Sequence, residues 1–260
     1  MNRGGQNTGT GYVYYHIPKC GGTTVAALAR LNFGKGRLLS IYEKNPTMNL
    51  VKIDQIASFD RYRLIKTHVP YGAVPGLADL PAFTILRNPR DRLVSLMRDI
   101  RDRDSHYLHE SLGGAKFSVD RFLEQAPFWE VDNILVRYLI GRKGFTQEAI
   151  GESELDEAID SLLHRLTWFG LQEQFDKTIQ LLSRRLDMTF VADLKLNESR
   201  KTDSIQGSVE ASVSECVRLD EKLYAIAVDH FNRLAVDSDA RPILRNKIAL
   251  SFLRFASRVL

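Results

Sequence analysis

Residues 12–31 read Tyr12-Val-Tyr-Tyr-His-Ile-Pro-Lys-Cys-Gly-Gly-Thr-Thr-Val-Ala-Ala-Leu-Ala-Arg-Leu31, and this stretch decides the fold. Its apolar start predicts a buried strand, its two glycines predict a tight turn, and the residues after them predict a helix. Such a turn directs backbone N–H groups toward one point at the positive end of the helix dipole. Lys19 adds a positive charge there, and Thr23 and Thr24 add hydroxyl donors. The stretch therefore predicts a phosphate-binding loop.

The position of the lysine separates this loop from the Walker A loop of nucleotide hydrolases. A Walker A loop places its lysine after the glycines, whereas Lys19 precedes Gly21 and Gly22 and no second lysine follows them. The glycines still allow close approach of the backbone to a ligand. The loop thus predicts phosphate binding without the geometry of triphosphate hydrolysis. The alternative is a plain strand–turn–helix connection with a solvated lysine.

The composition is that of an ordinary globular protein, and it excludes several classes of function. The 260 residues carry a formal net charge of +4, which suits a polyanionic ligand, and no basic stripe indicates nucleic-acid binding. The two cysteines, Cys20 and Cys216, form no disulfide or zinc spacing. No signal peptide or membrane-spanning run is recognisable. We expect a flexible tail over residues 1–11, a single domain over residues 12–260, and a cytoplasmic location.

Strand and helix patterns alternate along the rest of the chain. This alternation predicts an α/β fold, with a mostly parallel central sheet covered by helices on both faces. The expected strands cover residues 37–42, 60–68, 81–86, 167–171 and 189–196, and the clearest helical patterns cover residues 154–166, 175–186 and 209 onward.

Three polar segments follow the expected strands directly, at residues 19–24, 68–72 and 87–95. Ligands of open parallel sheets bind at the carboxyl ends of the strands, so these segments are expected to lie near one another. Arg87 and Ser95 can then converge on a second anion, because arginine offers a planar fork and serine a hydroxyl. A pairing of Arg87 with an acidic neighbour, and a plain helix-face serine, are the alternatives.

The motifs together resemble those of PAPS-dependent sulfotransferases, on the side of the glycan 2-O-sulfotransferases and their bacterial relatives. His16-Ile-Pro-Lys-Cys-Gly-Gly-Thr-Thr24 resembles the family's loop for the 5′-phosphosulfate, and Thr84-Ile-Leu-Arg-Asn-Pro-Arg-Asp-Arg-Leu-Val-Ser95 resembles its 3′-phosphate segment. Lys66-Thr-His-Val-Pro-Tyr-Gly72 resembles the segment that carries the catalytic histidine of the uronyl 2-O-sulfotransferases. Weaker similarities cover residues 132–141, 169–175 and 220–224.

The resemblance implies a role for each part of the two phosphate motifs. Lys19 would neutralise the charge that grows on the leaving phosphate oxygen. Arg87 and Ser95 would bind the 3′-phosphate, which distinguishes PAPS from ATP. The 5′ side would be held by the backbone of the loop residues Cys20, Gly21, Gly22, Thr23 and Thr24. The reaction would be an in-line sulfuryl transfer that yields 3′,5′-ADP and needs no metal.

The resemblance also implies a base that takes the proton of the acceptor hydroxyl. His68 is the first candidate, because an imidazole is partly unprotonated near neutral pH; a strand-end histidine bound by the backbone is the alternative. Other glycan sulfotransferases use a glutamate after the second strand, which makes Glu43 the rival. Asn133 and Arg137 are candidates for acceptor binding, or they pair within the fold.

The expected acceptor is a carbohydrate hydroxyl, and the sequence predicts neither its identity nor the oligomeric state. Two other functions stay open on the sequence alone. One is a kinase-like phosphotransferase that uses ATP and magnesium on a related fold. The other is a binding module for anions or glycans that has lost the reaction.

Overall fold

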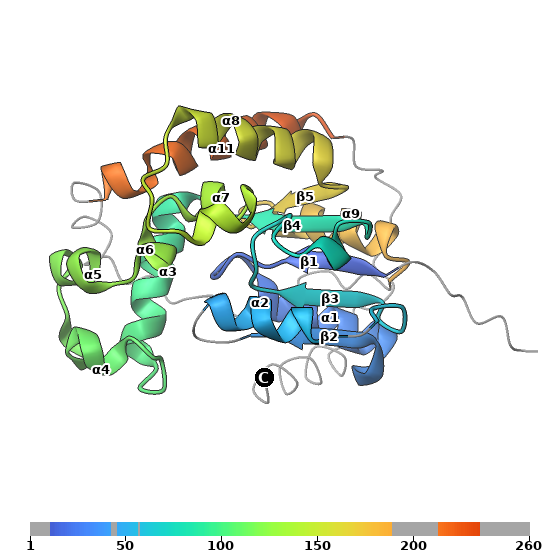
Figure 1. Ribbon diagram of the computed structural model, residues 1–260, viewed down its shortest axis with the longest axis horizontal. Helices are drawn as coiled ribbons and strands as arrows, with labels where there is room; N and C mark the ends of the chain where they lie inside the picture. Colours follow the sequence, from blue (N-terminus) through green and yellow to red (C-terminus); the bar gives the residue numbers. More distant parts are fainter. Residues whose placement is uncertain (1–10, 43–45, 57, 189–212, 235–260) are drawn as a thin grey trace, which may run out of the picture.

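The computed structural model describes residues 11–42, 46–56, 58–188 and 213–234. Their strands form a five-stranded sheet in the order β2-β3-β1-β4-β5 (Figure 1). All neighbouring strands pair in parallel, which confirms the predicted α/β fold. The strands are β1 (Tyr12–Tyr15), β2 (Leu38–Ile41), β3 (Leu64–Thr67), β4 (Ala82–Leu86) and β5 (Trp168–Leu171).

The central strand β1 is buried on both faces. Val13 and Tyr14 point to opposite faces of the sheet and are both fully buried, which explains why this strand reads as an unbroken apolar run. Tyr15 lies in register with Thr67 of β3, and the His16 N–H donates to the Thr67 carbonyl oxygen at 2.8 Å. The residues that follow these two strands are therefore side by side at one edge of the sheet.

Helices surround the sheet (Figure 1). Helices α1 and α2 contact β2, whereas α9 and α11 contact β5 and α8 packs along α11. The longer helices are α1 (Gly22–Phe33), α2 (Pro46–Asp54), α3 (Pro89–Asp102), α5 (Val119–Gln125), α8 (Glu152–Asp160), α9 (Phe175–Arg185) and α11 (Ser214–Asn232), and the one-turn helices are α4 (His109–Leu112), α6 (Phe128–Val131) and α7 (Ile134–Arg137).

A second hydrophobic cluster forms beside α3. Leu108 and Leu112 of the α4 segment are buried there against Met97, Phe117 and Phe122. The ring of His109 is tied to this cluster, since its Nδ1 lies 2.6 Å from the Ile100 carbonyl oxygen. This packing is hard to predict from the sequence because charged residues surround the two leucines. Leu108 and Leu112 lie four residues apart and therefore share one helix face.

Some sequence predictions fall on residues outside the described ranges. These are the N-terminal tail up to residue 10, the strand expected over residues 189–196, and the last residues of the chain. The single-domain organisation stays a prediction. Within the described ranges, no helix combines the length and apolar character needed to cross a bilayer.

Candidate functional site

The loop between β1 and α1 is held by hydrogen bonds to its carbonyl oxygens. The Tyr14 hydroxyl donates to the Cys20 carbonyl oxygen at 3.1 Å. Arg87 Nη1 donates to the Lys19 carbonyl oxygen, also at 3.1 Å. Two successive carbonyl groups of the loop are thereby engaged by protein donors. This arrangement fixes the loop, and the Cys20 N–H is also engaged, since it donates to the Ile17 carbonyl oxygen at 3.3 Å. The donors that an anion can meet are therefore those at the start of the helix that follows.

The N–H groups at the start of α1 have no carbonyl partner within the helix. The first helical hydrogen bond joins Val25 N to the Gly21 carbonyl oxygen at 3.3 Å, so residues 22–24 carry free helix-terminal donors. Gly21 adopts a left-handed φ of 80°. A Cβ on Gly22 would lie 2.1 Å from Nε2 of His16, so only glycine fits there.

Lys19 is placed by an unusual backbone conformation. Its φ is 70°, a left-handed value that costs a non-glycine residue of order 1 kcal/mol and is typical of functional loops. Its Nζ lies 3.0 Å from Oδ2 of Asp99 in α3, and Asp99 also pairs with Arg103. Burial lowers the pKa of Lys19, and Asp99 opposes that change. The ammonium group therefore stands at the loop with one carboxylate partner that an anionic ligand would displace or share.

The predicted binding site for a second anion, made by Arg87 and Ser95, adjoins the loop through Arg87. Arg87 follows β4 directly, and its guanidinium lies against the loop through the bond to Lys19. Ser95 lies two turns further on in α3 and is 9% exposed. The structure thus brings Arg87 to the loop between β1 and α1, while phosphate binding by the loop and the joint contact of Arg87 and Ser95 with one anion stay predictions.

Cys20 contributes to the loop through its backbone. Its side chain is fully buried, and burial raises the pKa of its thiol to about 12. A thiol of this kind stays protonated and does not act as a nucleophile. Its carbonyl group is the acceptor for Tyr14, as described above.

His68 lies at the carboxyl end of β3, in direct contact with His16. The two rings approach at 3.0 Å between His16 Nδ1 and His68 Nε2, and both side chains are less than a tenth exposed. The ring of Tyr42 packs edge-on against His68 at 4.8 Å between centroids. Burial first, and then the charge of Lys66, hold the pKa of His68 well below its ordinary value. An imidazole in this state is neutral near pH 7.

Asn133 joins α7 to α11. Its side-chain oxygen accepts hydrogen bonds from Leu219 N at 2.8 Å and Asp220 N at 3.2 Å. In return, the Asp220 carboxylate accepts from Leu135 N at 3.0 Å and Val136 N at 2.9 Å, at the start of α7. Asn133 therefore holds two helices together in this structure, and its predicted role in acceptor binding stays a prediction.

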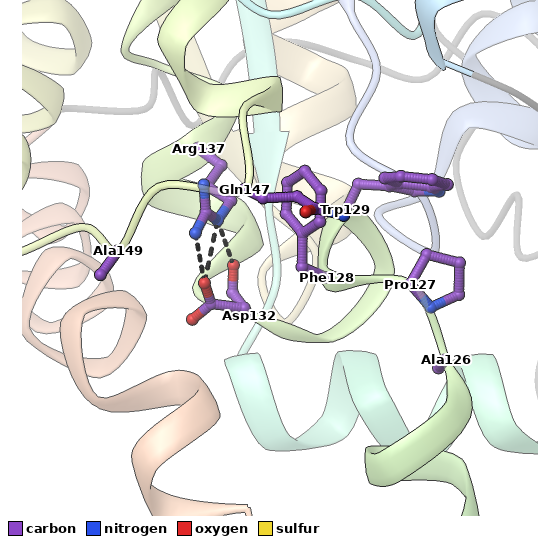
Figure 2. Close-up of a pocket in the computed structure, with 8 residues that line it drawn as sticks. All are labelled: Ala126, Pro127, Phe128, Trp129, Asp132, Arg137, Gln147 and Ala149. Atoms are coloured by element: carbon purple, nitrogen blue, oxygen red, sulfur yellow. Dashed lines mark hydrogen bonds and ion pairs between the residues drawn. The ribbon is translucent and has the colours of Figure 1, made fainter.

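Arg137 is almost completely buried beside a hollow of about 570 Å³ (Figure 2). Its guanidinium pairs with Asp132, as Figure 2 shows, and stacks on the Phe128 ring at 4.9 Å. The remaining bonds of its guanidinium go to the carbonyl oxygens of Asp132, Gly144, Thr146 and Glu148. All three guanidinium nitrogens are engaged by the protein, and the predicted role of Arg137 in acceptor binding stays a prediction.

Helix α6 carries a buried carboxyl group that no sequence motif indicates. Glu130 of α6 is 8% exposed, and its Oε1 accepts from the Tyr107 hydroxyl at 2.6 Å. Burial raises the pKa of Glu130, and the hydrogen bond from Tyr107, followed by the charges of Arg92 and Lys19, opposes that change. Neither Asp99 nor Glu130 stands in a recognisable motif, because each belongs to a helix distant from the loop in the sequence.

His16 also contacts a candidate site residue, although its place at the start of the loop motif gives it no evident role in phosphate binding. The available signal was its place directly after one central strand, while His68 directly follows the neighbouring strand. The rival base Glu43 lies outside the described residues. Among the residues that are described, no group of three histidine, cysteine or acidic side chains gathers as a metal site would require.

Comparisons with known proteins give a likeness in structure but none in sequence. No family model matches the chain, and no curated protein matches its sequence. In structure, the chain is similar to mouse sulfotransferase SULT7A1, whose crystal structure is a complex with PAP, at 17% sequence identity and a TM-score of 0.41. The match covers 80% of this chain and 64% of the mouse protein, so it spans less than two thirds of that protein.

Proposed function

We propose that this protein transfers a sulfuryl group from PAPS to a hydroxyl group, with a carbohydrate as the expected acceptor. The observation that carries the proposal is the hydrogen bond of 3.1 Å from Arg87 Nη1 to the Lys19 carbonyl oxygen. It joins the loop for one phosphate to the arginine expected to bind another. A ligand with two separate phosphate groups suits this arrangement better than one with a single polyphosphate tail.

Each residue of the loop has a defined task under this proposal. The free N–H groups of residues 22–24 and the ammonium group of Lys19 bind the 5′ side of the donor. PAPS supplies the sulfuryl group, and Lys19 neutralises charge on the phosphate oxygen that leaves. One preorganised charge of this type contributes ~10²–10³ to the rate. Arg87 and Ser95 bind the 3′-phosphate.

His68 acts as the base that removes the proton of the acceptor hydroxyl. Its low pKa keeps it neutral near pH 7, and its place beside the loop suits attack in line with the leaving phosphate. If sulfuryl transfer survives His68→Ala within a few-fold, the base is another group, and Glu43→Gln is the next variant to measure.

Thermal-shift titration with 3′,5′-ADP, ADP, and ATP with magnesium tests the donor. Ligand at a hundred times its Kd stabilises the native state by about 2.7 kcal/mol, so 3′,5′-ADP is expected to raise the Tm far more than ADP at equal concentration. Arg87→Gln should abolish that difference. Arg61→Gln is the matched control, because this exposed arginine precedes the opposite end of β3.

The same titration separates the alternatives. An ATP response that depends on magnesium and equals that of 3′,5′-ADP would favour a kinase-like phosphotransferase. Binding of 3′,5′-ADP without formation of sulfated product, across a panel of glycan and small hydroxyl acceptors, would favour a binding module that has lost the reaction.

A further inference from the structure

The two histidines at the carboxyl ends of β1 and β3 are hydrogen-bonded to each other. His16 Nδ1 and His68 Nε2 lie 3.0 Å apart, and the ring planes cross at 68°. The parallel register of Tyr15 with Thr67 sets this approach, because each histidine follows one of these residues. The contact is therefore built into the sheet and does not depend on a surface loop.

A hydrogen bond between two neutral imidazoles holds one proton between the rings, and each ring carries one N–H in total. Either His16 donates from Nδ1, which places the other proton of the pair on His68 Nδ1, or His68 donates from Nε2, which leaves His68 Nδ1 with a lone pair. The outer atoms, His16 Nε2 and His68 Nδ1, are buried and have no protein partner among the described residues.

The surroundings keep the pair from holding an additional proton in the resting protein. Burial is the main cause that lowers the pKa of both rings. The charge of Lys66 acts in the same direction on both, and that of Lys19 on His16. Two tyrosine rings also lie against the pair: that of Tyr42 packs on His68, and that of Tyr14 packs on His16 at 5.2 Å between centroids. Both rings are thus neutral, so the tautomer decides which nitrogen of His68 carries a free lone pair.

We propose that His16 is a positioning residue that accepts a hydrogen bond from His68 Nε2–H and so makes His68 Nδ1 the basic atom of the reaction. This inference rests on the proposed function. It assigns the tautomer of the base and gives the first residue of the phosphate-loop motif a task that phosphate binding does not require.

The proton and electron balance of the step follows from this assignment. The acceptor oxygen forms a bond to sulfur while its proton passes to His68 Nδ1. The bond between sulfur and the 5′-phosphate oxygen breaks, and its electron pair leaves with the phosphate. His68 becomes an imidazolium whose Nε2–H remains bonded to His16 Nδ1. A charged donor makes that bond stronger, so His16 stabilises the ring more after proton transfer than before it.

The position of His16 is held by its packing on the loop. A Cβ on Gly22 would meet Nε2, Cε1 and Cδ2 of the His16 ring at 2.1, 2.2 and 2.5 Å. The ring therefore lies flat against the start of α1, and the loop limits its rotation. A histidine fixed in this way can hold the ring of His68 in one orientation.

The test combines nitrogen NMR of the imidazoles with substitutions of His16. In the protein labelled with ¹⁵N, His68 is expected to carry its proton on Nε2 and a bare Nδ1. His16→Asn keeps a side-chain acceptor at the position of Nδ1, whereas His16→Gln places its amide near the position of Nε2 and His16→Leu offers no acceptor. The asparagine variant should keep this tautomer, and the other two should lose it.

Kinetics give the second measurement. His16→Leu and His16→Gln should lower kcat for sulfuryl transfer about 10- to 100-fold with KM for PAPS unchanged, and His16→Asn should recover most of kcat. The rise in Tm with 3′,5′-ADP should persist in all three variants, which shows that they fold and bind the donor product.

Two results would overturn the inference. One is a bare Nε2 on His68 in the wild-type protein. The other is an equal loss of kcat in His16→Asn and His16→Leu while the response to 3′,5′-ADP persists. Failure of the proposed function would look different: 3′,5′-ADP would not bind to the wild-type protein, and the NMR measurement would still decide the direction of the hydrogen bond.

Discussion

The ammonium group of Lys19 is paired with the Asp99 carboxylate, with 3.0 Å between Nζ and Oδ2. This carboxylate competes with any anion for the loop lysine. Asp99→Asn removes the competing charge, so the affinity for 3′,5′-ADP is expected to rise about three- to tenfold, a modest gain because both side chains are partly exposed to water. Isothermal titration calorimetry measures the change.

Asp104→Asn is the matched control for this prediction. It removes the same charge from a side chain that is 97% exposed and lies just after α3. It should leave the affinity nearly unchanged, since solvent and salt screen a charge in that position. An equal gain in both variants would indicate a general effect of net charge.

Gly22→Ala is expected to destabilise the protein by about 2–3 kcal/mol, because the new methyl group would overlap the ring of His16. The shift of the urea unfolding midpoint measures the loss. Gly36→Ala is the control, since a Cβ there meets no atom within 4 Å. If both variants lose the same stability, the ring of His16 moves aside readily and does not hold the loop.

The pH profile of kcat/KM reports the protonation state of the base. The pKa of His68 lies well below its ordinary value of 6.5 because of burial and the charge of Lys66. Activity should therefore stay level as the pH falls to 6.5 and decrease only at lower values. A half-maximal rate at or above pH 6.5 would contradict a buried, neutral His68 as the base.

Asp220 is expected to produce a measurable pH dependence of stability. Burial raises its pKa to about 7 from an ordinary value of 3.8. Between about pH 4 and pH 7 the native state then binds more protons than the unfolded state, so the free energy of unfolding decreases as the pH rises. The slope is at most ~1.4 kcal/mol per pH unit.

Asp220→Asn isolates this effect, because asparagine does not titrate. Subtracting its unfolding free energies from those of the wild type, measured by urea denaturation across the pH range, should give a difference that falls toward pH 7. A flat difference would show that the backbone donors Leu135 N and Val136 N keep the carboxylate ionised.

The sequence alone determined the parallel sheet and the glycine turn that precedes α1. Buried parallel strands are short apolar runs, and a glycine turn before a helix leaves donors without partners whatever surrounds it. The alternation of strand and helix patterns along the chain predicts the first, and residues 12–31 predict the second. The place of His68 at the end of an expected strand predicts that it lies near the loop.

Only the tertiary structure decided which side chains meet at that loop. Asp99 reaches Lys19 from α3, through an ion pair between residues far apart in the chain. The pairing of His16 with His68 required the exact distance between two strand ends, which spacing in the sequence does not encode. The sequence shows that Arg137 is charged but not what surrounds it. Its pairing with Asp132 and with the Thr146 carbonyl oxygen became visible only in the packed structure.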